Sequence, residues 1–155
     1  MKIYGAGSLA DIRACLELGV EGILTNPQGF EQYYGGSMTL QEITQAICDL
    51  TDLPVYIQIH GENTERIVER AQELHRISPG QIGFKVISDE KGFLAIRRLA
   101  DAGIRCIATT LFSVSQAAVA ASAGAAGICP FVSRAAAIGM DPGRIIGTIR
   151  RGYDR

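Results

Sequence analysis

Short apolar runs alternate with longer segments of helical period along this chain, and the alternation repeats about six times. Each apolar run is too short for a helix and is bounded by glycine, proline or polar residues, as buried parallel strands usually are. The pattern therefore predicts β-α units around a parallel sheet, in the α/β class. The predicted strands are residues 2–4, 22–24, 54–59, 82–87, 105–109 and 127–130.

Between these runs, apolar residues recur three and four positions apart, which is typical of amphipathic crossover helices. The segment 116–123 is almost entirely alanine and serine, so a helix there can pack closely, and Gly124 can end it. The other helices are predicted over residues 40–49, 64–77, 91–102 and 144–151.

Six strands with right-handed crossovers fit either a barrel or an open doubly wound sheet, and periodicity does not distinguish the two. A complete eight-stranded (β/α) barrel typically takes about 250 residues, although compact examples approach about 200. The 155 residues of this chain are enough for one domain. They fall about two β/α units short of a closed barrel.

The composition and the net charge indicate which kind of binding partner to expect. The chain is 47% hydrophobic and 20% charged, which is typical of a globular protein. Fifteen basic against sixteen acidic residues give a net charge of -1, so no general electrostatic attraction to nucleic acid or to an anionic membrane is expected. Small molecules are the expected partners.

No apolar segment reaches the length of a membrane span, and the first residues lack the apolar region of a signal peptide, so a cytoplasmic location is expected. The cysteines are widely separated in apolar surroundings, without a Cys-x-x-Cys pair, and we expect reduced core thiols. They are Cys15, Cys48, Cys106 and Cys129.

Lys85 is the most conspicuous residue, because it interrupts the apolar run 82–87. If that strand is frayed or lies near an edge, the lysine stem can extend to water and the charge needs no further explanation. If the strand is central, desolvation lowers the pKa of the amine and supplies free base. A free amine can attack a ketone and form an electron-withdrawing iminium.

Other polar residues follow or interrupt predicted strands. Thr25 and Asn26 follow the second strand, where they form either a turn or part of a site at the C-terminal rim. Gln58 and Thr109 lie among apolar neighbours and are, taken singly, more often hydrogen-bonded core residues. Arg134 follows the sixth strand, where a cation can hold a phosphate or can simply be solvated.

The opening segment 5–10 matches the weak form of a dinucleotide fingerprint, Gly-x-Gly-x-x-Ala. The preceding strand is very short, and the second strand does not end in the acid that would hold a ribose. Gly5 and Gly7 are therefore expected to serve a tight turn into a helix, and nucleotide binding is a minor alternative.

Taken in order, these residues resemble the transaldolase family, in particular its small members that include the bacterial fructose-6-phosphate aldolases. The resemblance covers essentially the whole chain, and the ordered set is more specific than any one piece. The matching segments are residues 22–27, 83–86, 91–96, 102–105, 109–113 with Gln116, 123–125 and 129–134.

The resemblance implies a parallel (β/α)8 TIM-barrel fold. Residues 1–155 would form a single barrel domain that ends after about six units, without strands 7 and 8. It also implies a class I aldolase that acts on ketose phosphates such as fructose 6-phosphate, without a metal or an organic cofactor. A homo-oligomer is expected as well.

By the same resemblance, Lys85 is the Schiff-base lysine, and Thr109 and Gln58 position the water that relays protons. Gln58 matches the glutamine of the fructose-6-phosphate aldolases. The substrate-binding residues would be Asn26 and Thr25 for donor hydroxyls, Phe131 at the border of the pocket and Arg134 for the phosphate.

The chain departs from the family pattern at Ala6, Leu24 and Ile87, where the family has an aspartate, a threonine and a proline. Two polar contacts are therefore absent. The alternative function is a catalytically impaired or inactive relative that binds sugar phosphate or acts as an assembly subunit.

Overall fold

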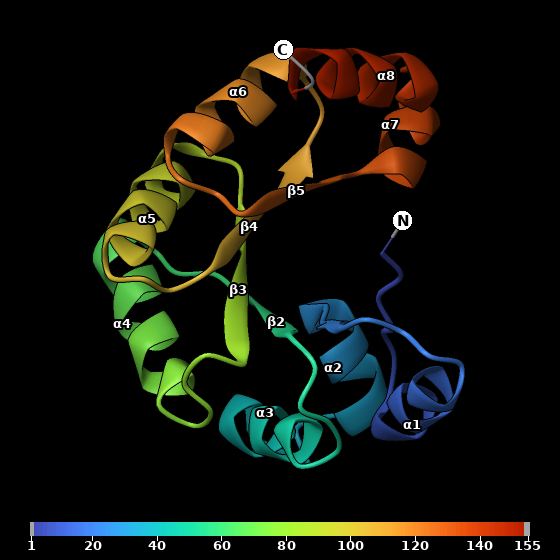
Figure 1. Ribbon diagram of the computed structural model, residues 1–155, viewed down its shortest axis with the longest axis vertical. Helices are drawn as coiled ribbons and strands as arrows, with labels where there is room; N and C mark the ends of the chain where they lie inside the picture. The colour runs from blue at the N-terminus through green and yellow to red at the C-terminus, as the bar shows by residue number, and fades with distance from the viewer. Residues whose placement is uncertain (1, 154–155) are drawn as a thin grey trace.

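The computed structural model describes residues 2–153, which form five parallel strands surrounded by helices. The strands follow one another in sheet order as in sequence, so each β-α unit adds one strand to the same edge. Figure 1 shows the sheet curled, with the helices in an arc around its outer face. The strands are β1 (Ile23–Leu24), β2 (Val55–Ile59), β3 (Ile82–Ile87), β4 (Cys106–Leu111) and β5 (Gly127–Pro130).

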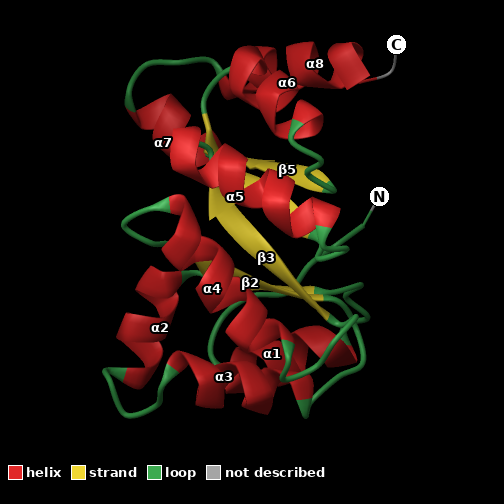
Figure 2. Ribbon diagram, turned by 90° about the vertical axis from the view of Figure 1, so that its left-hand side faces the viewer, coloured by secondary structure: helices red, strands yellow, loops and turns green. Residues whose placement is uncertain are grey.

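The helices that lie between consecutive strands in sequence act as crossovers, and the turned view in Figure 2 shows helices packed over the sheet. The α/β class and the TIM-barrel type are confirmed by this partial barrel. Across the described part of the chain, no helix combines the length and apolar content needed to cross a bilayer. The helices are α1 (Leu9–Glu17), α2 (Pro27–Tyr34), α3 (Leu40–Cys48), α4 (Thr64–His75), α5 (Glu90–Asp101), α6 (Val114–Ser122), α7 (Val132–Ala137) and α8 (Pro142–Tyr153).

The strand predicted over residues 2–4 is wrong as a strand, although the segment lies where it was expected. Gly5 forms a single parallel bridge to Ile23, and the Gly5 amide donates to the Gly22 carbonyl at 2.8 Å. The chain then turns at Gly7, whose φ is +134°, and Ser8 caps α1. Pairing therefore ends before a strand can extend, and the turn into a helix expected for Gly7 is confirmed.

The turn considered at Asn26 is a helix start. The Asn26 side chain accepts a hydrogen bond from the Gln28 amide, and Pro27 occupies the first turn of α2. Asparagine followed by proline is common to turns and to helix caps, so the local sequence does not separate the two. The pattern also missed the short helix α7. Gly124, with φ +87°, follows the C-cap of α6 as predicted.

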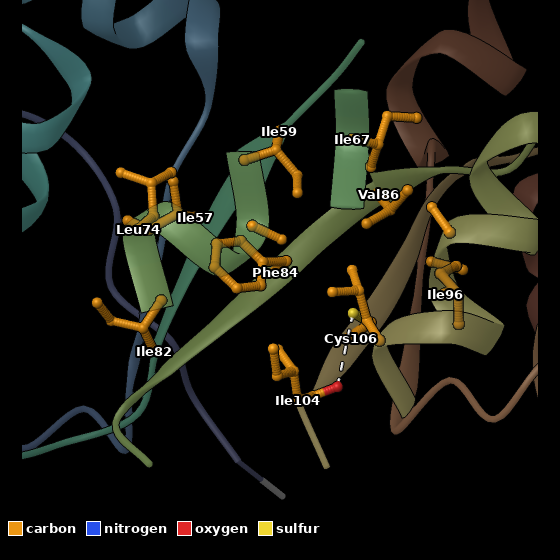
Figure 3. Packing of buried hydrophobic residues seen from close by; sticks show 14 of the residues in the cluster. Ile57, Ile59, Ile67, Leu74, Ile82, Phe84, Val86, Ile96, Ile104 and Cys106 are labelled. Carbon is orange, nitrogen blue, oxygen red and sulfur yellow. Dashed lines mark hydrogen bonds between the residues drawn. The ribbon is translucent and has the colours of Figure 1, made fainter. Parts of the chain in front are cut away.

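The hydrophobic core lies between the sheet and its helices. In β3 the side chains of Ile82, Phe84 and Val86 point to this layer, where Phe84 packs near Ile57 and Ile96 lies against the other end of the strand (Figure 3). Alternate residues of a strand point to opposite faces. The layer thus fixes which residues of β3 face the interior of the barrel.

Only one of the cysteines predicted in the core is fully buried there. Burial raises the pKa of the Cys106 thiol to about 12, which makes it inert at neutral pH. The other three thiols are partly buried, and all four are free in the described part of the chain.

Gly92 has a steric role at the start of α5. A Cβ on this residue would lie 1.9 Å from the carbonyl oxygen of Ile87, at the end of β3. The Gly92 amide also donates to the Asp89 side chain that caps the helix. A side chain larger than hydrogen therefore cannot fit without moving α5 away from β3.

We expect Gly92→Ala to lower the free energy of unfolding by about 2 to 4 kcal/mol, because rigid backbone faces the new methyl group. Gly147→Ala is the matched control, since a Cβ in α8 would meet only the flexible end of Arg151 at 3.4 Å. It should raise stability by about 0.5 to 1 kcal/mol. Urea denaturation measures both changes, and equal effects of the two variants would contradict the steric role.

Candidate functional site

Lys85 lies on the central strand of the sheet, and its neighbours on both sides are defined by the register. It is paired with Gln58 of β2 and with Ile107 of β4. Because Phe84 and Val86 face the helices, Lys85 faces the interior of the curled sheet. Residues paired in register on neighbouring strands point to the same face, so Gln58 lies beside Lys85.

The Lys85 side chain is only 7% exposed. This excludes the interpretation in which the lysine lies on a frayed or edge strand and reaches freely into water. Burial lowers the pKa of the Lys85 amine, and the nearby Cys129 thiol opposes part of that shift. No ion pair within residues 2–153 includes Lys85. A buried amine without a carboxylate partner favours its neutral, nucleophilic form.

Thr109 is two residues beyond Ile107 on β4, so it faces the same interior as Lys85 and lies closer to the C-terminal rim. It is fully buried, and its hydroxyl donates to the Cys129 carbonyl at 3.5 Å. The interior face of β2, β3 and β4 thus brings together the three predicted catalytic residues, Gln58, Lys85 and Thr109.

Thr25 joins β1 to β2. Its hydroxyl donates to the Tyr56 carbonyl at 3.3 Å and accepts a hydrogen bond from the backbone amide of Gln58 at 2.9 Å. Asn26, the next residue, is exposed and lines a hollow of about 300 Å³ that Ala6 and Gly7 also line. Lys85 is not among the lining residues of this hollow.

Phe131 and Arg134 lie beyond β5, on the side of β4 away from Lys85. The Phe131 ring meets Phe112 edge to face, with centroids 6.0 Å apart. The guanidinium carbon of Arg134 lies 5.4 Å from the Phe131 centroid, which is a cation–π contact on an exposed side chain. The structure therefore groups these two residues with each other rather than with the lysine.

A surface hollow of about 540 Å³ lies apart from this interior and is lined mainly by charged side chains of α4 and the loop after β2. Arginine and glutamate are mixed there, with no net excess that would select an anion or a cation. Within residues 2–153, no group of three or more His, Cys, Asp and Glu side chains is arranged to hold a metal ion.

Sequence reasoning missed three residues near Lys85 and Thr109. Cys129 faces the interior because it is paired with Thr109, and strand alternation could have indicated this. Ser88 donates to the Thr109 carbonyl through both its amide, at 2.9 Å, and its hydroxyl, at 2.6 Å. Thr110 is the one non-glycine residue with positive φ, +63°, among residues 2–153. No local pattern predicts either Ser88 or Thr110 in these roles.

The three departures from the family pattern place methyl groups around the same interior. Leu24 is paired with Tyr56, and Ile87 is paired with Thr109, so both face inward by alternation. Ala6 lies at the hollow beside Asn26. Ala6 and Leu24 thus add no side-chain hydrogen-bonding group on the N-terminal side of the interior, and Ile87 adds none at the end of β3.

The sequence and the fold of this chain both resemble those of known proteins. The family model described as Transaldolase/Fructose-6-phosphate aldolase matches residues 6–151. A probable transaldolase of Thermoplasma volcanium is 32% identical over 152 residues, which are 97% of this chain and 68% of that protein. A probable transaldolase of Coprothermobacter proteolyticus is 33% identical over 145 residues, 93% of this chain and 65% of its own length. The chain thus spans about two thirds of the length of these curated relatives.

Solved structures support the fold alone. A putative phosphonomutase from Burkholderia cenocepacia superposes with a TM-score of 0.65 at 19% identity, over 82% of this chain and 67% of that one. A putative dihydrodipicolinate synthetase from Pseudomonas aeruginosa gives 0.63 at 14% identity, over 96% and 61%. Because the family model spans nearly all of the chain and curated relatives match it at 32% and 33% identity, the chain belongs to the transaldolase/fructose-6-phosphate aldolase family.

Proposed function

We propose that this protein is a class I aldolase of the transaldolase type, which makes and breaks carbon–carbon bonds of ketose phosphates such as fructose 6-phosphate through a Schiff base on Lys85. The observation that carries the proposal is the burial of Lys85 on the central strand, which lowers the pKa of its amine. Family membership supports the same chemistry.

The reaction begins when the free Lys85 amine attacks the ketone carbon of the sugar. The resulting carbinolamine loses water and leaves an iminium. Loss of a proton from the hydroxyl on the far side of the scissile bond forms an aldehyde, and the bond electrons move to the iminium nitrogen as an enamine. Protonation and hydrolysis of the enamine release dihydroxyacetone, whereas addition to a second aldehyde transfers the three-carbon unit.

Proton transfer needs a group close to the iminium, and Thr109 and Gln58 are polar side chains on the same face as Lys85. Neither is a base at neutral pH, so each acts by hydrogen-bonding a water that carries the proton. Gln58 supports release of dihydroxyacetone rather than its transfer, by its resemblance to the fructose-6-phosphate aldolases.

Substrate hydroxyls would bind at Asn26 and Thr25, where β1 meets the hollow lined by Asn26. The phosphate would bind at Arg134, whose charge is exposed beside the Phe131 ring. Phe131 would then border the substrate. Residues 2–153 correspond, in this proposal, to about six of the eight units of a barrel. A homo-oligomer working in cytoplasmic carbohydrate metabolism is the setting that the family suggests.

The alternative is a relative with little or no turnover that binds sugar phosphate or serves as an assembly subunit. The apolar groups of Ala6, Leu24 and Ile87 favour it, because each lies where a family member has a different residue. Nucleotide binding at the first turn is disfavoured. The Asp11 carboxylate already accepts the Ser8 amide at the start of α1, and its charge would repel a phosphate there.

Incubation with dihydroxyacetone followed by borohydride reduction should leave a stable mass increase on Lys85, found by peptide mapping. Lys85→Met should abolish the adduct. Lys91→Met is the matched control and should keep it, since Lys91 donates to the Gly61 carbonyl away from the interior. A folded protein that binds fructose 6-phosphate but forms no adduct would support the non-enzymatic alternative.

Arg134→Ala should raise the KM for fructose 6-phosphate by about tenfold, because one charge-assisted hydrogen bond to the phosphate is lost. Adduct formation with unphosphorylated dihydroxyacetone should not change. Arg97→Ala, which removes a surface ion pair with Asp101, is the control and should affect neither value. Equal losses with both substrates would contradict phosphate binding by Arg134.

The lowered pKa of Lys85 also predicts how stability varies with pH. The unfolded chain holds the proton over a range in which the folded protein has released it, so the free energy of unfolding rises with pH across that range. Below the folded pKa, both states are charged and the folded protein bears the full burial cost.

Lys85→Met should therefore be more stable than the wild type by about 1 to 3 kcal/mol at neutral pH, since it removes a buried polar group that lacks a charged partner. The advantage should shrink as the pH rises toward the ordinary lysine value of about 10.4. Urea denaturation across this range measures it, with Lys2→Met as the exposed control. An advantage independent of pH would mean that the amine does not titrate as a buried group.

A further inference from the structure

A ring of hydrogen bonds closes around the C-terminal end of β4, and the proposed chemistry does not account for it. The Thr109 carbonyl accepts hydrogen bonds from the backbone amide of Ser88, at 2.9 Å, and from its hydroxyl, at 2.6 Å. The Gln116 side chain donates to the Ser88 carbonyl at 3.1 Å and accepts the Phe112 amide at 2.9 Å. The ring thus connects β3, β4 and α6.

Inside this ring the backbone of β4 is kinked. Thr110 has φ +63°, a conformation that is a genuine outlier for a β-branched residue. The register between β4 and β5 shifts at the same place, between Thr109 and Leu111. Such a bulge re-aims the side chains next to it. A strained conformation of this kind persists only where the surroundings hold it.

The ring holds the kink at its most sensitive point. Two donors from Ser88 fix the carbonyl of Thr109 and therefore the plane of the peptide between Thr109 and Thr110. The Gln116 side chain fixes the Phe112 amide on the other side of the kink. Thr110 therefore has little freedom to relax. The same backbone sets the position from which the Thr109 side chain starts, and its hydroxyl donates to the Cys129 carbonyl at 3.5 Å.

We propose that Ser88 and Gln116 are positioning residues, which act through the backbone at Thr109 to aim its hydroxyl into the interior beside Lys85. The proposal rests on the proposed function, because it gives Thr109 its task in proton transfer. Ser88 is 6% exposed, so its hydrogen bonds to the Thr109 carbonyl are shielded from competing water. These two hydrogen bonds and those of Gln116 are called the clamp below. Neither Ser88 nor Gln116 forms its hydrogen bonds with Lys85, so the amine should still form its adduct when either residue is changed.

Three variants test the clamp. Ser88→Ala removes one donor to Thr109 and keeps the amide, Ser88→Thr restores a hydroxyl, and Ser78→Ala removes a serine side-chain hydrogen bond to Gln81 near the opposite end of β3. Each variant and the wild type are assayed for the borohydride adduct on Lys85 with dihydroxyacetone and for kcat and KM with fructose 6-phosphate.

For Ser88→Ala we expect an adduct equal to that of the wild type, a kcat reduced about tenfold or more because the hydroxyl of Thr109 is misplaced, and a KM within about twofold. Ser88→Thr should recover most of the kcat, and Ser78→Ala should match the wild type. Gln116→Met provides a second test that leaves Ser88 intact, and it should reduce kcat in the same direction with the adduct retained.

Wild-type kcat in both Ser88→Ala and Gln116→Met would overturn the positioning role alone. A parallel loss of adduct, kcat and folded protein in these variants would also overturn it, in favour of a purely structural clamp. A wild-type protein that forms no adduct would instead overturn the proposed function, and the positioning role with it.

Discussion

The burial of one amine on the central strand is the constraint on which the site depends. An ammonium ion withdrawn from water is costly, and the protein reduces that cost by favouring the neutral amine of Lys85. A carboxylate partner would offset this desolvation cost, but it would also keep the amine protonated and therefore not nucleophilic. No acid is paired with Lys85 within the described residues, so β3 must be held in place by other contacts.

Those contacts come from the opposite face of the same strand. Ile82, Phe84 and Val86 are almost entirely buried against the helices, whereas Lys85 lies between them in sequence and faces the interior. Strand alternation thus separates the residues that stabilise the strand from the residue proposed to react. Gly83 adds to the separation, because a Cβ there would lie 2.7 Å from the Tyr56 ring and would force that ring off the interior face.

The sequence predicted the parts of this structure that depend on local periodicity. The strands after the first and the helices α3 to α6 and α8 were found because their apolar spacing is regular, and Lys85 stood out because it interrupts such a run. The short strand at residues 2–4 was wrong because a turn at Gly7 limits its pairing. The Ser88 contacts were not predictable, because Thr109 is 21 residues away and Gln116 is 28 away, and no local pattern records such a distance.

The polar groups around Lys85 are distributed so that different residues serve iminium formation and proton transfer in the proposed chemistry. Formation of the iminium starts from the free amine and a carbonyl and also needs a proton for the hydroxyl that leaves the carbinolamine. The environment that frees the amine belongs to β3 and its two neighbours. Proton transfer requires a hydrogen-bonding group near the reacting carbon, and Ala6 supplies none from the N-terminal side. In the proposed mechanism that task therefore falls to Thr109 and Gln58, on the strands that flank β3. In the proposed mechanism, the geometry of the Thr109 backbone, rather than the reactivity of Lys85, therefore governs the proton transfers that follow formation of the iminium.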